Sequence, residues 1–227
     1  MEQQKVLLIL LLILSLTVLD RLFFVAIPML LIEREVRPLS IGILFSVASL
    51  VLVISRFFIG KVSDWVGRKG FIASGLLLTL ASALIVPIKV SYSFLVLAKV
   101  LKEVGTNLVD SVKDAFIADL FDRKRRRKVL RLAGNFLVVS KALGVLLGAV
   151  TTYYLAIAHS FIVAALMLML TLMLLLPLNV RRRKVSKEFK LRDVPKNFYP
   201  ILMIGVAQTF AFTLSYFPAF FILSNNL

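Results

Sequence analysis

Cysteine is absent from this 227-residue chain, and histidine occurs only once, as His159. The chain can therefore form neither a disulfide nor a thiolate metal site, and a metal site built from several histidines is excluded. It also lacks a recognisable nucleophile–base pairing, a glycine-rich phosphate loop and an acidic metal-binding repeat. The sequence thus predicts a protein that is not an enzyme and that uses neither a metal nor an organic cofactor.

Acidic residues are scarce as well, with 12 Asp and Glu against 28 Lys and Arg, which leaves a net charge of +16. A basic excess of this size can indicate nucleic-acid binding. Here, however, the cations cluster in short blocks at the ends of apolar runs, and 60% of the residues are hydrophobic. We therefore exclude nucleic acid as a partner and expect the lipid bilayer instead.

Long apolar runs dominate the rest of the chain. Runs of about 18 or more residues can cross a bilayer, and only helices satisfy the backbone there. We expect an all-α membrane protein with seven spans, at roughly residues 6–32, 40–59, 71–88, 92–120, 129–155, 160–177 and 198–223. Residues 1–178 would form a six-helix transmembrane bundle, residues 179–197 a basic cytoplasmic linker, and residues 198–227 a seventh transmembrane helix.

The cations alternate between the links that join these spans. Residues 60–69, 122–128 and 179–197 are rich in Lys and Arg, whereas residues 33–38, 89–91 and 156–159 are poor in them. Cation-rich links stay on the cytoplasmic side. We therefore expect a multi-pass protein of the cytoplasmic (inner) membrane with its N-terminus inside. The block at residues 181–196 could also contact anionic lipid head groups.

The fourth span carries charges that a lipid-facing helix would not tolerate. At about 100° per residue they fall on one third of its circumference. These residues are Lys99, Lys102, Glu103, Asp110, Lys113 and Asp114. Lys99–Glu103 and Asp110–Lys113 have the spacing of ion pairs. A stripe of this length indicates a water-filled cavity or a polar bundle interior, and the alternative is a purely structural ladder of salt bridges.

Ionisable residues also occur in the first and fifth spans. Asp20 and Arg21 lie near the middle of the first span, where a carboxylate can exchange a proton. Asp20 is therefore a candidate coupling site, or else the partner of a lysine in the fourth span. Lys141 shares one side of the fifth span with Gly134, Gly144 and Gly148, and we expect it to point inward. Lys141 could contact a solute or pair with a carboxylate.

Residues 60–69 read Gly-Lys-Val-Ser-Asp-Trp-Val-Gly-Arg-Lys. The spacing G-x-x-x-D-x-x-G-R-K resembles the signature link between helices two and three of the major facilitator superfamily of secondary transporters. A plain cytoplasmic turn would explain the cations, but not the two glycines and the aspartate at this spacing. Residues 97–105, in which Lys99 replaces an arginine frequent in the family, and the basic linker are also similar to that family's first half.

The resemblance implies one half of a twelve-helix carrier with a cytoplasmic gate. The gate residues would be Gly60, Asp64, Gly67, Arg68, Lys69 and Asp119. The glycines would allow a tight turn and a close approach of the helices. Asp64 would face a helix N-terminus of the second half, and Arg68 would pair with Asp119. Trp65 replaces a usual cation, and residues 144–149 lack the proline of the family's antiporter motif, so drug–proton exchange is not supported there.

Two functions follow from this interpretation. The first is a secondary active transporter of a small solute, working by alternating access with a coupled ion or proton, or the N-terminal portion of such a carrier. The second is a non-transporting half or an assembly subunit. It would need a separate second-half polypeptide or a homodimer, because carriers of this kind rock one half against the other.

Overall fold

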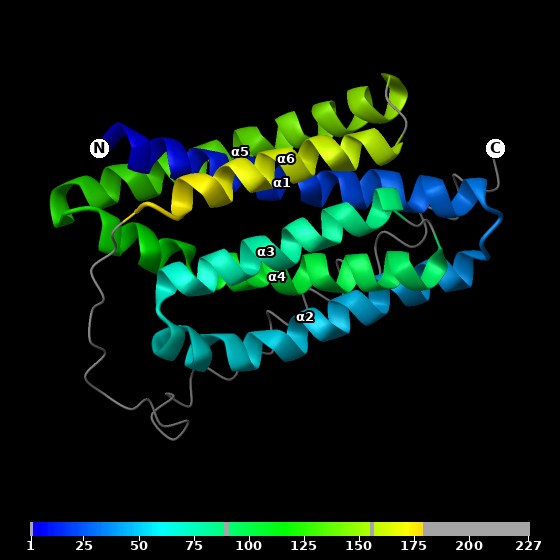
Figure 1. Ribbon diagram of the computed structural model, residues 1–227, viewed down its shortest axis with the longest axis horizontal. Helices are drawn as coiled ribbons and strands as arrows, with labels where there is room; N and C mark the ends of the chain where they lie inside the picture. Colours follow the sequence, from blue (N-terminus) through cyan, green and yellow to red (C-terminus); the bar gives the residue numbers. More distant parts are fainter. Residues whose placement is uncertain (1, 89–90, 155–156, 179–227) are drawn as a thin grey trace.

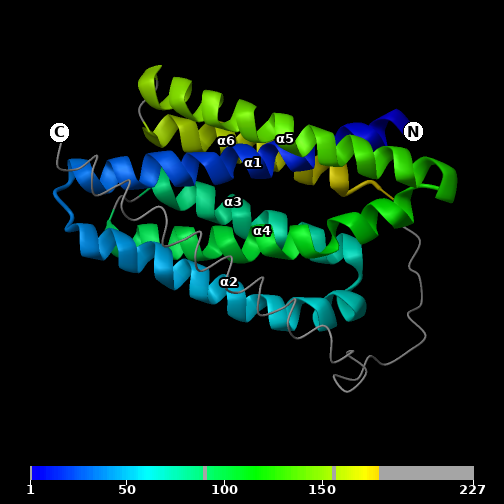
Figure 2. The same cartoon turned by 180° about the vertical axis from the view of Figure 1, so that it is seen from behind.

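The computed structural model describes residues 2–88, 91–154 and 157–178, and the regular structure in these ranges is helical (Figure 1). The helices are α1 (Glu2–Glu33), α2 (Pro38–Val66), α3 (Arg68–Ile88), α4 (Tyr92–Leu120), α5 (Arg123–Tyr154) and α6 (Ile157–Leu175). They lie side by side as an elongated bundle (Figures 1 and 2). The expected basic linker, residues 179–197, and the seventh span, residues 198–223, lie outside the described residues.

Two of the expected links are much shorter in the structure. Helix α2 continues to Val66, so Gly67 alone separates it from α3. The expected ten-residue link at residues 60–69 is therefore wrong, and Gly60 lies inside a helix rather than in a turn. No proline interrupts the stretch, and polar side chains at a helix end can be solvated, so the helix continues past its apolar part. Gly67 makes the turn, with a φ of 88° that favours glycine.

The second shortened link lies before α5. This helix begins at Arg123, so the run of six cations at residues 123–128 forms its first turns and not a loop. Lys and Arg are good helix formers, and the backbone amides of Arg125 and Arg126 bond to the carbonyl of Asp122. Helices α4 and α5 are therefore joined by Phe121 and Asp122 alone.

Helix α1 lies at the centre of the packing. It packs along α5 and α6 and also contacts α4, while α3 packs along α4 and α6, and α2 packs along α4 (Figure 1). Its side chains are therefore buried over much of its length. The rings of Phe23 in α1 and Phe161 in α6 meet edge to face, with centroids 5.1 Å apart. Helix α1 therefore connects α5 and α6 with α4.

Length and composition identify three helices in the described residues as long and apolar enough to cross a membrane. They are α1, α3 and the part of α5 up to Val150. Two shorter apolar segments, Leu39–Leu52 and His159–Leu175, belong to α2 and α6. Helix α4 falls outside both groups because of its charged stripe. The all-helical architecture is thus confirmed, while the number of seven spans stays a prediction.

Helices α3 and α4 approach each other at two glycines. A Cβ atom added to Gly105 would lie 2.4 Å from the Thr79 hydroxyl oxygen and 2.7 Å from the Gly75 carbonyl oxygen. A Cβ atom on Gly75 would in turn lie 2.7 Å from the Gly105 carbonyl oxygen. Close backbone approach at small residues is a main source of helix association in membranes. The pair therefore sets the distance between α3 and α4.

We expect Gly105→Ala to destabilise the protein by about 1–3 kcal/mol, because the new methyl group meets backbone atoms that cannot move aside. Gly134→Ala is the matched control, since a Cβ atom there meets nothing within 4 Å. Alanine favours helix over glycine, so the control should be neutral or slightly stabilising. Thermal unfolding in detergent measures both. A parent-like unfolding temperature for Gly105→Ala would contradict the close approach.

Candidate functional site

A buried ionic cluster joins α1 to α4 near the middle of both helices. We use this name for Asp20, Lys99, Lys102 and Glu103. The Lys102 ammonium donates to the carboxylates of Asp20 and Glu103, and lies 3.0 Å from Glu103 Oε1. Lys99 Nζ lies 2.7 Å from the same Glu103 oxygen. The expected Lys99–Glu103 pair is thus present, and so is the expected contact of Asp20 with a lysine of the fourth span.

Exposure differs sharply within the cluster. The Lys102 side chain is 2% exposed, whereas the Asp20 side chain is 43% exposed. A buried ammonium is tolerated only when paired, and Lys102 has two carboxylates. Asp20 therefore forms the accessible edge of the cluster, and Lys102 forms its interior.

Two aromatic rings that the sequence did not single out complete the surroundings of Lys99. Its ammonium lies 4.9 Å from the ring centroid of Phe45 and 5.9 Å from that of Phe23, distances at which the ring faces attract a cation. Phe23 lies three residues after Asp20, a spacing that could have indicated it. Phe45, in α2, carried no signal because only the fold brings it to α4.

Arg21 extends the cluster toward α5. Its Nε atom lies 3.9 Å from the Asp20 carboxylate, and it is buried without a hydrogen-bond partner among the described residues. A Cβ atom on Gly144 would lie 3.0 Å from Arg21 Cγ, so α5 packs directly on this side chain. With Lys99 and Lys102, Arg21 makes three cations against two carboxylates. The site therefore carries one positive charge in excess.

The expected charged stripe of α4 divides into two parts. Its first part belongs to the buried ionic cluster. Its second part contains Asp110, Lys113 and Asp114, where both carboxylates are exposed and Lys113 Nζ lies 3.0 Å from Asp110 Oδ1. Within the described ranges, no three His, Asp or Glu side chains lie close enough to hold a metal ion. The two parts of the stripe thus differ in burial, although they share one face of the sequence pattern.

The glycine side of α5 differs from the expectation. Gly144 and Gly148 are buried against α1, but Gly134 is exposed. Lys141 is exposed too, and the described part of the chain offers it no ion-pair partner, so it lies outside the contact between α5 and α1. The helix rotates by about 60° between Lys141 and Gly144. That rotation places the lysine beside the α1 contact and not within it.

The signature cations join three helices at one end of the bundle. Arg68 Nη1 lies 2.5 Å from Asp119 Oδ2 and 3.1 Å from the Ala115 carbonyl, so α3 is bound to α4 as the resemblance implied. Lys69 Nζ donates to the carbonyls of Leu176 and Leu178, at 2.6 and 2.8 Å. It thereby satisfies backbone groups at and just beyond the end of α6. Of Asp64 the structure describes the helical backbone only.

Lys102→Met should destabilise the protein by about 3–5 kcal/mol, because it leaves two carboxylates without their shared cation. Lys113→Met is the matched control on the same helix. Its partner Asp110 is 63% exposed, so the loss there should not exceed about 1 kcal/mol. Thermal unfolding of the two variants in detergent makes the comparison. Equal losses would show that Lys102 has no special place in the packing.

This chain is similar in sequence and in structure to known proteins. A family model described as Major Facilitator Superfamily matches residues 8–227. Multidrug resistance protein 3 of Bacillus subtilis (strain 168) is 31% identical over 93 residues, which are 41% of this chain and 18% of that protein. The crystal structure of the human organic anion transporter MFSD10 (TETRAN) superposes with a TM-score of 0.66 at 20% identity.

That superposition covers 85% of this chain and 52% of the human one. The chain thus spans about half the length of the solved structure and a smaller share of the bacterial relative. The likeness in structure shows the fold, and the family model covers nearly every residue. The chain is a multi-pass membrane protein that belongs to the Major Facilitator Superfamily.

Proposed function

We propose that the protein is a secondary active transporter of a small solute, or the first half of one, working by alternating access in the cytoplasmic membrane. Membership of the family and the fold of the bundle support transport as the activity. A second half would complete the solute path, because such carriers move one half against the other. That half would belong to the same polypeptide, to a separate one or to a second copy.

The buried ionic cluster is the observation that carries this proposal. Four ionisable side chains at the middle of membrane helices are costly, and such groups mark solute or ion paths. A purely structural role would require only one pair. Here Lys102 has two carboxylates and Glu103 has two lysines, so each of these two side chains would keep one partner if its other contact opened.

We assign proton coupling to Asp20. Its carboxylate is the accessible edge of the cluster, and it contacts Lys102 across the α1–α4 interface. Protonation would remove the attraction between Asp20 and Lys102 and would leave Lys102 with Glu103 alone. Proton binding at Asp20 would thus weaken the α1–α4 contact, and this would couple the proton to a movement of the helices.

We assign the solute an anionic group. The site has one positive charge in excess, and Arg21 has a buried Nε atom without a hydrogen-bond acceptor among the described residues. An arginine fork suits a carboxylate or another planar anion. The human relative is named for the organic anions that it transports itself, and for this chain the support is the charge around Arg21. The exposed Lys141, which belongs to α5, would be a second cation for the same anionic group.

A gate at the cytoplasmic end of the bundle would use the contacts of Arg68 and Lys69. Arg68 and Asp119 bind α3 to α4, and Lys69 binds α3 to the end of α6. These three helices would therefore move as one body when the halves rock. The cation-rich ends face the cytoplasm by the positive-inside rule, which places the N-terminus inside. The alternative of a non-transporting subunit has no observation of its own in the described residues.

Proteoliposomes that enclose the pH dye pyranine test the coupling. Small carboxylates and matched amines are added outside, and the internal pH is followed. We expect a pH change with at least one carboxylate for the parent chain, and its loss in Asp20→Asn, which cannot exchange the proton.

Asp110→Asn is the matched control, because this exposed carboxylate on α4 lies outside the buried ionic cluster. It should retain the response of the parent. Equal proton movement by the parent and Asp20→Asn would remove Asp20 as the coupling site. No movement with any solute in any variant would instead favour the non-transporting subunit.

A further inference from the structure

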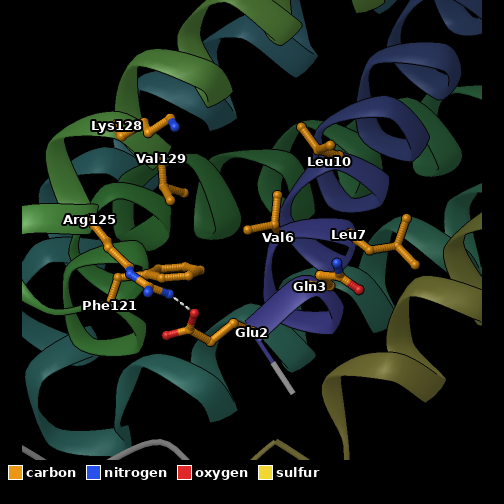
Figure 3. Close-up of a pocket in the computed structure, with 9 residues that line it drawn as sticks. All are labelled: Glu2, Gln3, Val6, Leu7, Leu10, Phe121, Arg125, Lys128 and Val129. Carbon is orange, nitrogen blue, oxygen red and sulfur yellow. Dashed lines mark ion pairs between the residues drawn. The ribbon is translucent and has the colours of Figure 1, made fainter.

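A cleft of about 670 Å³ lies between the first turns of α1 and the first turns of α5 (Figure 3). We call it the α1–α5 cleft. Its lining residues are Glu2, Gln3, Val6, Leu7, Leu10, Phe121, Arg125, Lys128 and Val129. It is separate from the buried ionic cluster, which lies farther along α1.

One wall of the cleft is apolar and belongs to the membrane part of α1. Val6 projects from α1 toward Val129 (Figure 3), and Leu7 and Leu10 of the same helix also line the cleft. Leu7 is 52% exposed, a large apolar surface at the edge of a membrane helix. This wall suits an acyl chain, because it continues directly into the apolar length of α1.

The mouth of the cleft is basic. Arg125 and Lys128 line it from successive turns of α5 (Figure 3), and the cation run from Arg123 to Lys128 surrounds them. Arg125 forms an ion pair with Glu2, the one acid in the lining. The two cations therefore exceed the acid by one charge. The first turn of α5 adds the partial positive charge of a helix start.

The position of the cleft suits a ligand of the membrane surface. It lies at the end of the bundle that also carries the α2–α3 and α4–α5 links (Figure 1). A basic mouth above an apolar wall matches an anionic phosphate with attached hydrocarbon. Such lipids are enriched in the cytoplasmic leaflet, where each Lys or Arg adds to their attraction.

We propose that the α1–α5 cleft binds an anionic phospholipid of the cytoplasmic leaflet. Arg125 and Lys128 hold its phosphate, and one acyl chain lies along Val6, Leu7 and Leu10. This proposal rests on the proposed orientation, with the N-terminus inside, and is independent of the transported solute and of its coupling. The chain's own linker is a poor occupant, because residues 181–196 are themselves strongly basic.

Lipid binding to the full chain in detergent tests this site. Native mass spectrometry gives the association constants of phosphatidylglycerol and of phosphatidylcholine. We expect the parent to prefer phosphatidylglycerol, and Arg125→Gln/Lys128→Gln to lose about tenfold of that preference. Glu2→Gln should raise the preference, because it removes the competing carboxylate from Arg125.

The control is Arg123→Gln/Lys124→Gln, which removes the same charge from the same helix turns outside the cleft lining. It should keep most of the preference. Equal losses in both double variants would show diffuse attraction and overturn the site, as would a parent without preference. Glycerol 3-phosphate, which lacks acyl chains, should not displace the lipid at equal concentration. Displacement would mean that the cleft binds phosphate alone.

Discussion

The contact between Lys102 and its two carboxylates is the constraint on which the centre of this bundle depends. An ammonium with 2% exposure in the interior of a helical bundle is unstable unless anions surround it. One of these anions, Asp20, comes from α1, and the other comes from the next position on α4. The charge pairing therefore specifies how α1 and α4 face each other, and it leaves Asp20 at the accessible edge.

Packing and electrostatics have different places in the molecule. Gly75 and Gly105 bring α3 and α4 together without charge, and Arg68 then binds the same two helices at their end through Asp119. Lys69 adds α6 to this group. The α1–α4 interface, by contrast, contains the ion pairs of the buried ionic cluster. The proposed coupling therefore rests on the α1–α4 contact, and the contacts among α3, α4 and α6 would keep those helices together.

The sequence predicted much of this fold and part of the site. The apolar runs located the described helices, and i,i+3 and i,i+4 spacing predicted the pairs Asp110–Lys113 and Lys99–Glu103. The pattern could not predict where the polar ends stop, because solvated polar residues extend a helix as readily as they end it. Residues 60–66 and 123–128 were therefore assigned to links. The pattern also grouped Lys141 with the glycines of α5, although a rotation of about 60° separates it from the α1 contact at Gly144.

The sequence by itself determined that the chain lies in a lipid bilayer, that it is helical and that it belongs to its family. Long apolar runs, cation-rich ends and residues 60–69 carry this information because they are local features of the chain. Only the tertiary structure decided which charges meet. It selected Lys102 over the other lysines of α4 as the partner of Asp20, and it placed Phe45 beside Lys99. It also left Arg21 with a buried nitrogen against α5. The physical reason is that side chains distant in sequence interact through short-range forces, so their partners depend on how the helices pack.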